Sequence, residues 1–199
     1  MTWMCTALGN EVNMRYPQPG TVNLQTIAHH LSQINRFTGA ARRPYSVAEH
    51  SLLVEEIAAR EFNLDVHGRF AALMHDAHEA YTSDLSTPAK AEVGQAWADF
   101  EARFERLVRN CFALHVANTV HLHKLKQADL IALATERAQL LPPGGTPWEV
   151  LIHVEPVHWV DLMSPERCST PWTGWRQAFT DRANQLDFER QQRVQQLGR

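Results

Sequence analysis

The sequence has few cysteines and no long apolar segment, and both absences exclude classes of protein. Its three cysteines, Cys5, Cys111 and Cys168, lie far apart and form no Cys-x-x-Cys pair. A sparse, odd count suits a reducing compartment and offers no cysteine-based metal site. No apolar stretch approaches the roughly 20 residues of a membrane-spanning helix, and the N-terminus lacks the pattern of a signal peptide. We therefore expect a cytoplasmic protein with no membrane contact.

An excess of positive charge is also missing, because the formal net charge is −3. Proteins that bind a nucleic-acid polymer through its phosphates usually carry a basic excess, so no such partner is expected. Apolar residues make up 44% of the chain and charged residues 21%, as in ordinary globular proteins. A length of 199 residues suits one domain with a substantial core.

Alternating strand patterns are nearly absent, whereas apolar residues recur at helical spacing along most of the chain, which predicts an all-α fold. Asn23 is an acceptable N-cap for a first helix, and Ser46 to Glu49 has the Ser-x-x-Glu form of a capping box that begins a second. Further helices are expected over about 67–80, after Pro88, over about 118–140 and from Pro171.

The remaining segments lack these signals. Residues 1–20 and 146–170 are expected to be irregular, and 191–199 to fray. The sequence thus predicts one compact domain over residues 1–199, with its core at about 21–140 and a C-terminal loop and helix at 146–190.

Four polar residues interrupt the apolar faces of three expected helices: His50 in the second, His75 and Asp76 in the third, and Asp129 in the fifth. A lone inward histidine is more often a satisfied core residue than a metal ligand. A buried carboxylate needs a partner, however, and these inward faces hold no lysine or arginine. Because one cation satisfies all four side chains, the set predicts a site for a divalent metal that activates water.

The ordered set of His50, His75-Asp76 and Asp129 resembles the metal-ligand motif of the HD-domain phosphohydrolase superfamily. Further segments are similar to its short nucleotide-cleaving members, which include phage dATP triphosphohydrolases and bacterial 5′-deoxynucleotidases: Ile34–Phe37, Tyr45–Ser51, His75–Glu79, Asp84–Lys90 and Ala128–Leu130. The resemblance covers about residues 21–140 strongly. It implies an HD-domain helical bundle whose four-residue set binds a divalent ion such as Co, Mn, Zn, Mg or Fe.

The resemblance also implies two catalytic carboxylates. Glu79 matches the acid/base residue of the superfamily, and a carboxylate beside a metal site can transfer a proton. The alternative for Glu79 is a structural role in orienting His75. Asp84 matches a carboxylate near the sugar or the attacking water, and an equally good interpretation makes it the cap of the following turn.

Four further residues match substrate contacts of the superfamily. Arg36 and Lys90 match basic residues that bind phosphate, whose oxygens need cations; the alternative is two solvated surface charges. Phe37 stands where some members have a tryptophan against the nucleotide, and this departure leaves the choice of sugar or base open. Pro88 matches a residue of the base pocket, although proline there also suits helix initiation.

The implied activity is hydrolysis of the 5′-phosphoester of a deoxynucleotide at the α-phosphorus. The product is phosphate from a monophosphate or tripolyphosphate from a triphosphate, and the sequence leaves both substrates open. Longer phosphate chains would need further cations, for which the candidates are Arg42, Arg43, Lys124 and Lys126.

Other functions are compatible with the same ligand set. They are another HD chemistry, such as hydrolysis of cyclic nucleotides or of (p)ppGpp, a nucleotide sensor without catalysis, and a helical bundle with a structural metal. Three tryptophans of the C-terminal third, Trp148, Trp159 and Trp172, would cover the core or form a subunit contact. The expected partners are a small nucleotide and further copies of the chain in a homo-oligomer.

Overall fold

The structure is a computed structural model that describes residues 2–197, and it is almost entirely helical, which confirms the predicted all-α class. The helices are α1 (Leu24–Leu31), α2 (Val47–Arg60), α3 (Val66–Leu73), α4 (Glu79–Thr82), α5 (Thr87–Val93), α6 (Gln95–Cys111), α7 (His115–Val120), α8 (Leu122–Leu140), α9 (Pro165–Ser169) and α10 (Trp172–Leu197). Three 3-10 turns join them: η1 (Pro19–Thr21), η2 (Arg36–Gly39) and η3 (Glu149–Leu151).

A short hairpin precedes the helices, in a segment predicted to be irregular. Strands β1 (Trp3–Cys5) and β2 (Glu11–Asn13) pair antiparallel, with Met4 opposite Val12. Strands of three residues are too short to display the alternation by which strands are recognised. Val12 is fully buried and so attaches the hairpin to the helical core.

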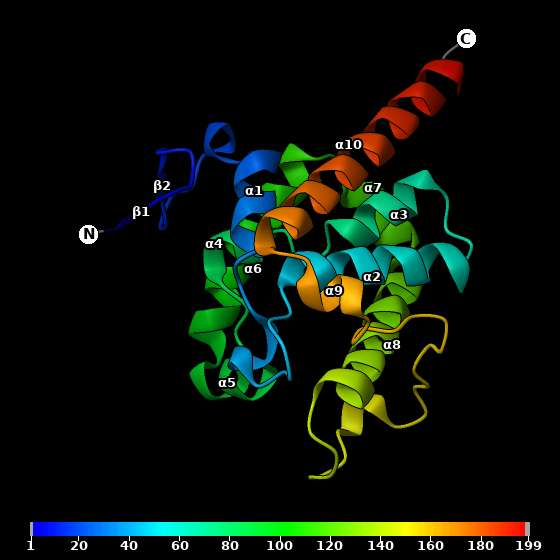
Figure 1. The fold of residues 1–199 in the computed structure, drawn as a ribbon. Coiled ribbons are helices and arrows are strands. Elements are labelled where there is room, and N and C mark those ends of the chain that lie inside the picture. The colour runs from blue at the N-terminus through cyan, green and yellow to red at the C-terminus, as the bar shows by residue number, and fades with distance from the viewer. Residues whose placement is uncertain (1, 198–199) are drawn as a thin grey trace.

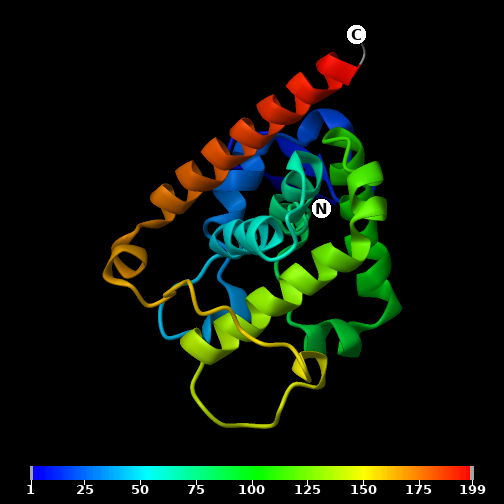
Figure 2. The same ribbon diagram turned by 90° about the vertical axis from the view of Figure 1, so that its right-hand side faces the viewer.

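Helix α2 lies at the centre of the fold and packs against α1, α3, α8 and α10. Helix α10 runs along one side of it and α8 along another, while the last turns of α10 project beyond the body of the molecule (Figures 1 and 2). Because these neighbours surround α2 and the end of α3, side chains on their inner faces meet those of α8.

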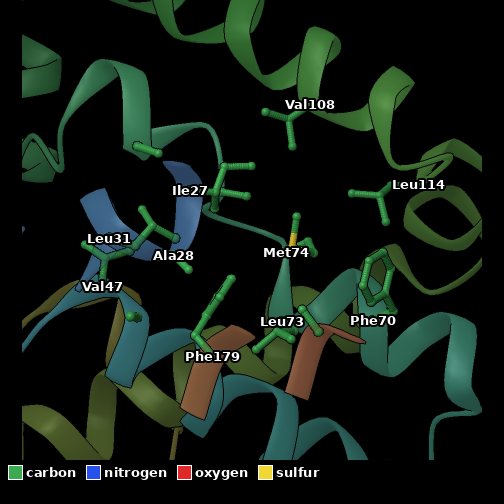
Figure 3. Packing of buried hydrophobic residues seen from close by; sticks show 14 of the residues in the cluster. Ile27, Ala28, Leu31, Val47, Phe70, Leu73, Met74, Val108, Leu114 and Phe179 are labelled. Carbon is green, nitrogen blue, oxygen red and sulfur yellow. The ribbon is translucent and has the colours of Figure 1, made fainter. Parts of the chain in front are cut away.

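One large apolar cluster holds α1, α3, α6 and α10 together. Figure 3 shows Ile27, Phe70, Met74 and Phe179 pointing into a common space, and all four are buried. Burying a side chain such as Phe179 contributes about 2–3 kcal/mol. The predicted amphipathic C-terminal helix is confirmed, because its buried residues Phe179, Ala183 and Leu186 recur at helical spacing.

Several predicted helix boundaries are wrong. The helix from Asn23, whose apolar spacing continues to Ile34 in the sequence, stops at Leu31. Helix α10 continues as far as Leu197, although 191–199 was expected to fray; residues 198–199 lie outside the described part of the chain. Gly94, at φ 68°, separates α5 from α6, since this left-handed conformation ends a helix at little cost for glycine. Within residues 2–197 no helix combines the length and the apolar character that crossing a membrane requires.

Candidate metal centre

The His75-Asp76 pair lies in a break between two helices, which corrects the prediction of one helix over 67–80. Helix α3 ends at Leu73 and α4 begins at Glu79. The break leaves the carbonyl of Ala72 without a helical amide partner four residues on, and the Nδ1 of His75 lies 2.8 Å from that oxygen. The carbonyl accepts the Nδ1–H bond, so the imidazole is held with its Nε2 directed away from the backbone.

The four predicted metal ligands converge. The Nε2 atoms of His50 and His75 are 3.2 Å apart, and Oδ2 of Asp76 lies 3.5 Å and 3.0 Å from them, respectively. Oδ1 of Asp129, from α8, lies 3.5 Å from Nε2 of His50 and 3.9 Å from Nε2 of His75. Side chains from α2, from the α3–α4 break and from α8 therefore meet at one point.

The hydrogen bonds behind the imidazoles favour a cation at that point. The Nδ1 of His50 lies 2.5 Å from Oε1 of Glu136 and donates to this carboxylate, as the Nδ1 of His75 donates to a carbonyl. With Nδ1 protonated in both rings, both Nε2 lone pairs face each other and two carboxylates. When both imidazoles are neutral, as metal ligation requires, this set of acceptors has no donor among its own members. The ligand atoms of His50, His75 and Asp76 lie close enough together to hold one metal ion, Asp129 adjoins them, and these donors suit a divalent ion.

The charges of the cluster alter its proton affinities in the expected directions. Burial opposes ionisation of Asp76, but His75 and His50 outweigh it and hold the pKa of Asp76 well below its usual value. The pKa of Asp129 is lowered in the same way, against burial, mainly by His50 and His75. Both carboxylates are therefore ionised at neutral pH and available as ligands.

Glu136 is a residue of the site that the sequence reasoning missed. It is fully buried on α8, and besides His50 it accepts bonds from the hydroxyl of Tyr45 at 3.0 Å and from Nη2 of Arg36 at 3.1 Å. It follows Asp129 by seven residues, or two helical turns, so it lies on the same face of the helix. This spacing of seven residues is the sequence signal that could have identified Glu136.

Arg36 is brought to the site by a closed loop. The amide of Arg36 donates to the carbonyl of Tyr45 at 2.9 Å, and the amide of Val47 donates to that of Ile34 at 3.0 Å, so both ends of the segment are paired. The guanidinium is largely buried against Glu136, with Nη1 at 3.9 Å from Oδ2 of Asp76. The predicted phosphate contact thus lies beside a predicted metal ligand.

The turn after Arg36 carries backbone strain. Phe37 and Thr38 have φ values of 57° and 53°, in the left-handed region that costs a non-glycine residue roughly 1–2 kcal/mol. Such conformations persist where the surroundings hold them and cluster at functional sites. Phe37 is half-buried and packs beside Trp148, with ring centroids 6.4 Å apart.

Glu79 and Asp84 both lie close enough to the charged groups of the site for their pKa values to be shifted. Glu79 is 3% exposed, and its Oε2 is buried without a hydrogen-bond partner. Burial, together with the nearby carboxylates of Asp76 and Asp84, raises the pKa of Glu79 well above its usual value. The pKa of Asp84 is also raised, first by burial, although Arg36 opposes this shift. A buried carboxyl of high pKa suits proton transfer.

Lys90 lies next to Glu79 and is held by a second acidic residue. Its ammonium is 2.6 Å from Oε1 of Glu101, on α6, and 4.0 Å from Oε1 of Glu79. The Nε2 of His78 is 3.5 Å from the same Glu101 oxygen. Sequence reasoning missed Glu101, because the packing of α6 on α5 that brings it to Lys90 is tertiary. Pro88 lies in the first turn of α5 and is exposed, so its predicted place in a base pocket stays a prediction.

Arg43, one of the four further cations proposed for a longer phosphate chain, is already paired with a carboxylate. Its Nη1 and Nη2 donate to the two carboxylate oxygens of Glu49 at 2.8 Å and 2.6 Å. Glu49 is fully buried, and its Oε1 also accepts a hydrogen bond of 2.9 Å from Nη1 of Arg167, which lies on α9. The predicted capping box is therefore corrected. The hydroxyl of Ser46 does accept the amide of Glu49, but the carboxylate of Glu49 pairs with Arg43 and Arg167.

Replacing Glu49 with alanine is therefore expected to destabilise the fold by about 3 kcal/mol, because it leaves Arg43 largely buried without its counter-charge. Urea denaturation, followed by the linear dependence of the free energy of unfolding on urea, measures the change. Glu56→Ala is the control, since Glu56 pairs with Arg60 at the exposed surface of the same helix and should change stability by less than about 0.5 kcal/mol. Equal effects of the two changes would contradict the assignment.

Glu136→Gln tests the link between α8 and His50. The amide keeps the shape of the carboxylate but removes its charge, and partners of ligating histidines typically contribute about 10–100-fold to metal affinity. We expect a loss of that size when Mn²⁺ or Co²⁺ is titrated against a competing chelator. Glu149→Gln, an exposed change in η3, should leave the affinity unaltered. Unchanged affinity in Glu136→Gln would assign Glu136 to folding alone.

Comparison with known proteins places the chain among relatives of similar size. No family model matches it. An uncharacterized protein of Rhodobacter capsulatus is 33% identical over 142 residues, which cover 69% of this chain and 72% of the relative. The chain belongs to the same family as this protein. The uncharacterized protein YfdR of Escherichia coli K12 is 37% identical over 128 residues, covering 64% of this chain and 66% of the relative.

Membership of this family assigns no activity, because neither relative's name states one. A functional conclusion for the chain has to come from its own site: the four converging candidate ligands, the buried Glu136 and Glu79, and the two cations Arg36 and Lys90 that lie beside them.

Proposed function

We propose that the chain is an HD-domain metal-dependent phosphohydrolase that cleaves the 5′-phosphoester of a deoxynucleotide at the α-phosphorus. One observation carries the proposal: His50, His75, Asp76 and Asp129 bring their ligand atoms to one point, with both imidazoles oriented by acceptors on Nδ1. A buried carboxyl, Glu79, and two cations adjoin the same cluster. This combination supports hydrolysis over a purely structural metal, which needs neither an acid nor anion-binding residues.

In this proposal the four converging residues hold one divalent ion. A divalent ion in such a site lowers the pKa of a bound water and polarises a phosphoryl oxygen. Its identity among Co, Mn, Zn, Mg and Fe is left to metal analysis.

Arg36 and Lys90 bind the phosphate. The Nη1 of Arg36 points to the carboxylate of Asp76, and Lys90 has about a third of its side chain exposed. Both can donate charge-assisted hydrogen bonds to the equatorial oxygens of the phosphoryl group. Lys90 would exchange its contact with Glu101 for the substrate, while Arg36 keeps its bond to Glu136.

Glu79 transfers the proton. Its buried Oε2 has no partner, and its raised pKa favours the protonated form, which can donate to the 5′-oxygen as the bond from that oxygen to phosphorus breaks. Arg36 and Asp76 lie close enough to Asp84 to shift its pKa in opposite directions, and we assign Asp84 to orienting the attacking water or the sugar. Phe37 and Pro88 are proposed contacts of the sugar or base.

The expected partners follow from this activity. The substrate is a small nucleotide rather than a polymer, the setting is the cytoplasm, and the chain is proposed to act as a homo-oligomer. For a triphosphate substrate, the remaining cations for the longer phosphate chain are Arg42, Lys124 and Lys126, because Arg43 is paired to Glu49. Lys126 lies 3.1 Å from Oδ2 of Asp129, which places it at the edge of the cluster.

A substrate panel tests the proposal. We expect dAMP or dATP to be cut faster than AMP or ATP, because the resemblance is to members that act on deoxynucleotides. Phosphate and tripolyphosphate are measured separately with the deoxynucleoside, so that the bond cleaved is identified. Equal rates on ribo- and deoxynucleotides would contradict the deoxy preference, and hydrolysis of cyclic nucleotides or (p)ppGpp alone would replace the substrate class.

A further inference from the structure

Away from the metal centre, one part of the surface is hollowed and lined by positively charged side chains. The segment 15–18, which follows the N-terminal hairpin, and helix α6 line a shallow, open groove of about 590 Å³. The residues that line it include Arg15, Tyr16, Arg103, Arg106, Leu107 and Asn110. Its volume lies within the range of about 300–1,000 Å³ that is usual for small-molecule sites.

The charge of this groove is unbalanced. Arg15, Arg103 and Arg106 line it, no acidic residue does, and within residues 2–197 none of the three forms a salt bridge. Most other arginines described above, such as Arg36 and Arg43, are paired with buried carboxylates. Three like charges around one hollow repel each other, and an anion bound between them would relieve that repulsion.

Hydrogen bonds hold part of the groove's lining in place. The Nη1 of Arg103 donates to the carbonyl of Met14 at 2.8 Å, which restrains one guanidinium and leaves its other N–H groups free. The side-chain oxygen of Asn13 accepts the amides of Arg15 and Tyr16 at 2.9 Å and 3.0 Å. A guanidinium that is held in place loses less entropy when it binds a phosphate.

The groove also has aromatic and apolar surface. Tyr16 is 67% exposed, and the guanidinium of Arg15 lies 6.0 Å from its ring centroid. Leu107 is buried beneath the groove. A flat exposed ring beside cations offers a stacking surface for a planar group, such as a nucleobase, attached to an anion.

This groove is separate from the metal centre. On α6, Glu101 faces Lys90, whereas Arg103 and Arg106 follow it by two and five positions. At about 100° per residue, these positions are rotated by roughly 200° and 140° around the helix. Helix α6 therefore turns one face to the site of the proposed chemistry and another to the groove.

We propose that this groove is a second ligand site, which binds a phosphorylated small molecule with a planar ring, such as a nucleotide. Arg103, Arg106 and Arg15 hold the phosphate groups, and Tyr16 stacks on the ring. A polymer is a poorer candidate, because the net charge of −3 repels a polyanion over the rest of the surface. The site does not depend on the activity proposed for the metal centre.

Photolabelling of the full-length protein with 8-azido-ATP tests the proposal, with labelled peptides mapped by mass spectrometry. We expect label on peptides from 15–18 and from 103–110, and inorganic tripolyphosphate should compete for it. The double variant Arg15→Gln/Arg106→Gln should lose roughly tenfold in labelling affinity, as expected for two charge-assisted contacts in a screened groove. Both arginines are exposed, so the fold, checked by its melting temperature, should be intact.

Arg193→Gln is the matched control, since Arg193 is an exposed arginine on α10, outside the groove. It should leave labelling of the groove unchanged. Label confined to peptides of the metal centre would overturn the proposal. So would groove labelling that the double variant does not weaken, that Arg193→Gln weakens equally, or that adenosine displaces while tripolyphosphate does not.

Discussion

His75→Ala should deplete the bound metal and reduce hydrolysis to an undetectable level. Nε2 of His75 lies within 4 Å of the ligand atoms of His50, Asp76 and Asp129, so its removal opens the cluster on one side. Loss of a residue that only orients a ligand typically costs about 10–100-fold in metal affinity, and loss of the ligand itself should cost at least as much. Alanine at His50, Asp76 or Asp129 should act in the same way.

The measurement is elemental analysis of the purified variants, paired with the substrate panel. His123→Ala is the control, because His123 is an exposed histidine of α8, the helix that also carries Asp129. It should keep the metal content and the rate of the unmodified protein. A full complement of metal in His75→Ala would remove this residue from the ligand set.

Glu79→Gln should retain the metal and lose turnover by a factor of roughly 10² or more, the usual contribution of general acid–base catalysis. The amide keeps the size of the carboxyl but cannot give a proton to the 5′-oxygen. Glu79→Ala should show the same loss if the proton is what matters. Because Glu79 is not one of the four converging residues, the metal content should be unaffected by either change.

Glu92→Gln is the matched control on α5, where Glu92 is exposed. The kinetic parameters kcat and KM are determined for each variant with the preferred substrate. Near-normal kcat in Glu79→Gln would return Glu79 to the alternative role of orienting His75. A rise in KM alone would indicate that it contacts the substrate without transferring a proton.

The convergence of His50, His75, Asp76 and Asp129 was predictable because each of them interrupts a local apolar pattern. His50 stands among aliphatic residues of α2, and Asp129 among those of α8, so helical periodicity alone directs both inward. The cap residues Asn23 and Ser46 were also local signals, and the structure confirms that both side chains accept an amide at the start of their helices.

The partners of these residues could not be predicted in the same way. Glu136 reaches Tyr45, His50 and Arg36 across 86 to 100 positions of the chain, and Glu101 reaches Lys90 only because α6 folds back on α5. Such contacts depend on helix packing, which periodicity does not specify. The break after Leu73 was missed for another reason, since residues 70–80 have good helical composition and contain no glycine or proline.

The two imidazoles differ in how they would tolerate sequence drift. His50 is oriented by the side chain of Glu136, so a single substitution at position 136 is enough to disturb it. His75 is oriented by the main-chain oxygen of Ala72, which every amino acid at that position would still provide. A single substitution at position 136 can therefore change the orientation of His50. The orientation of His75 changes only if the path of the backbone between α3 and α4 changes.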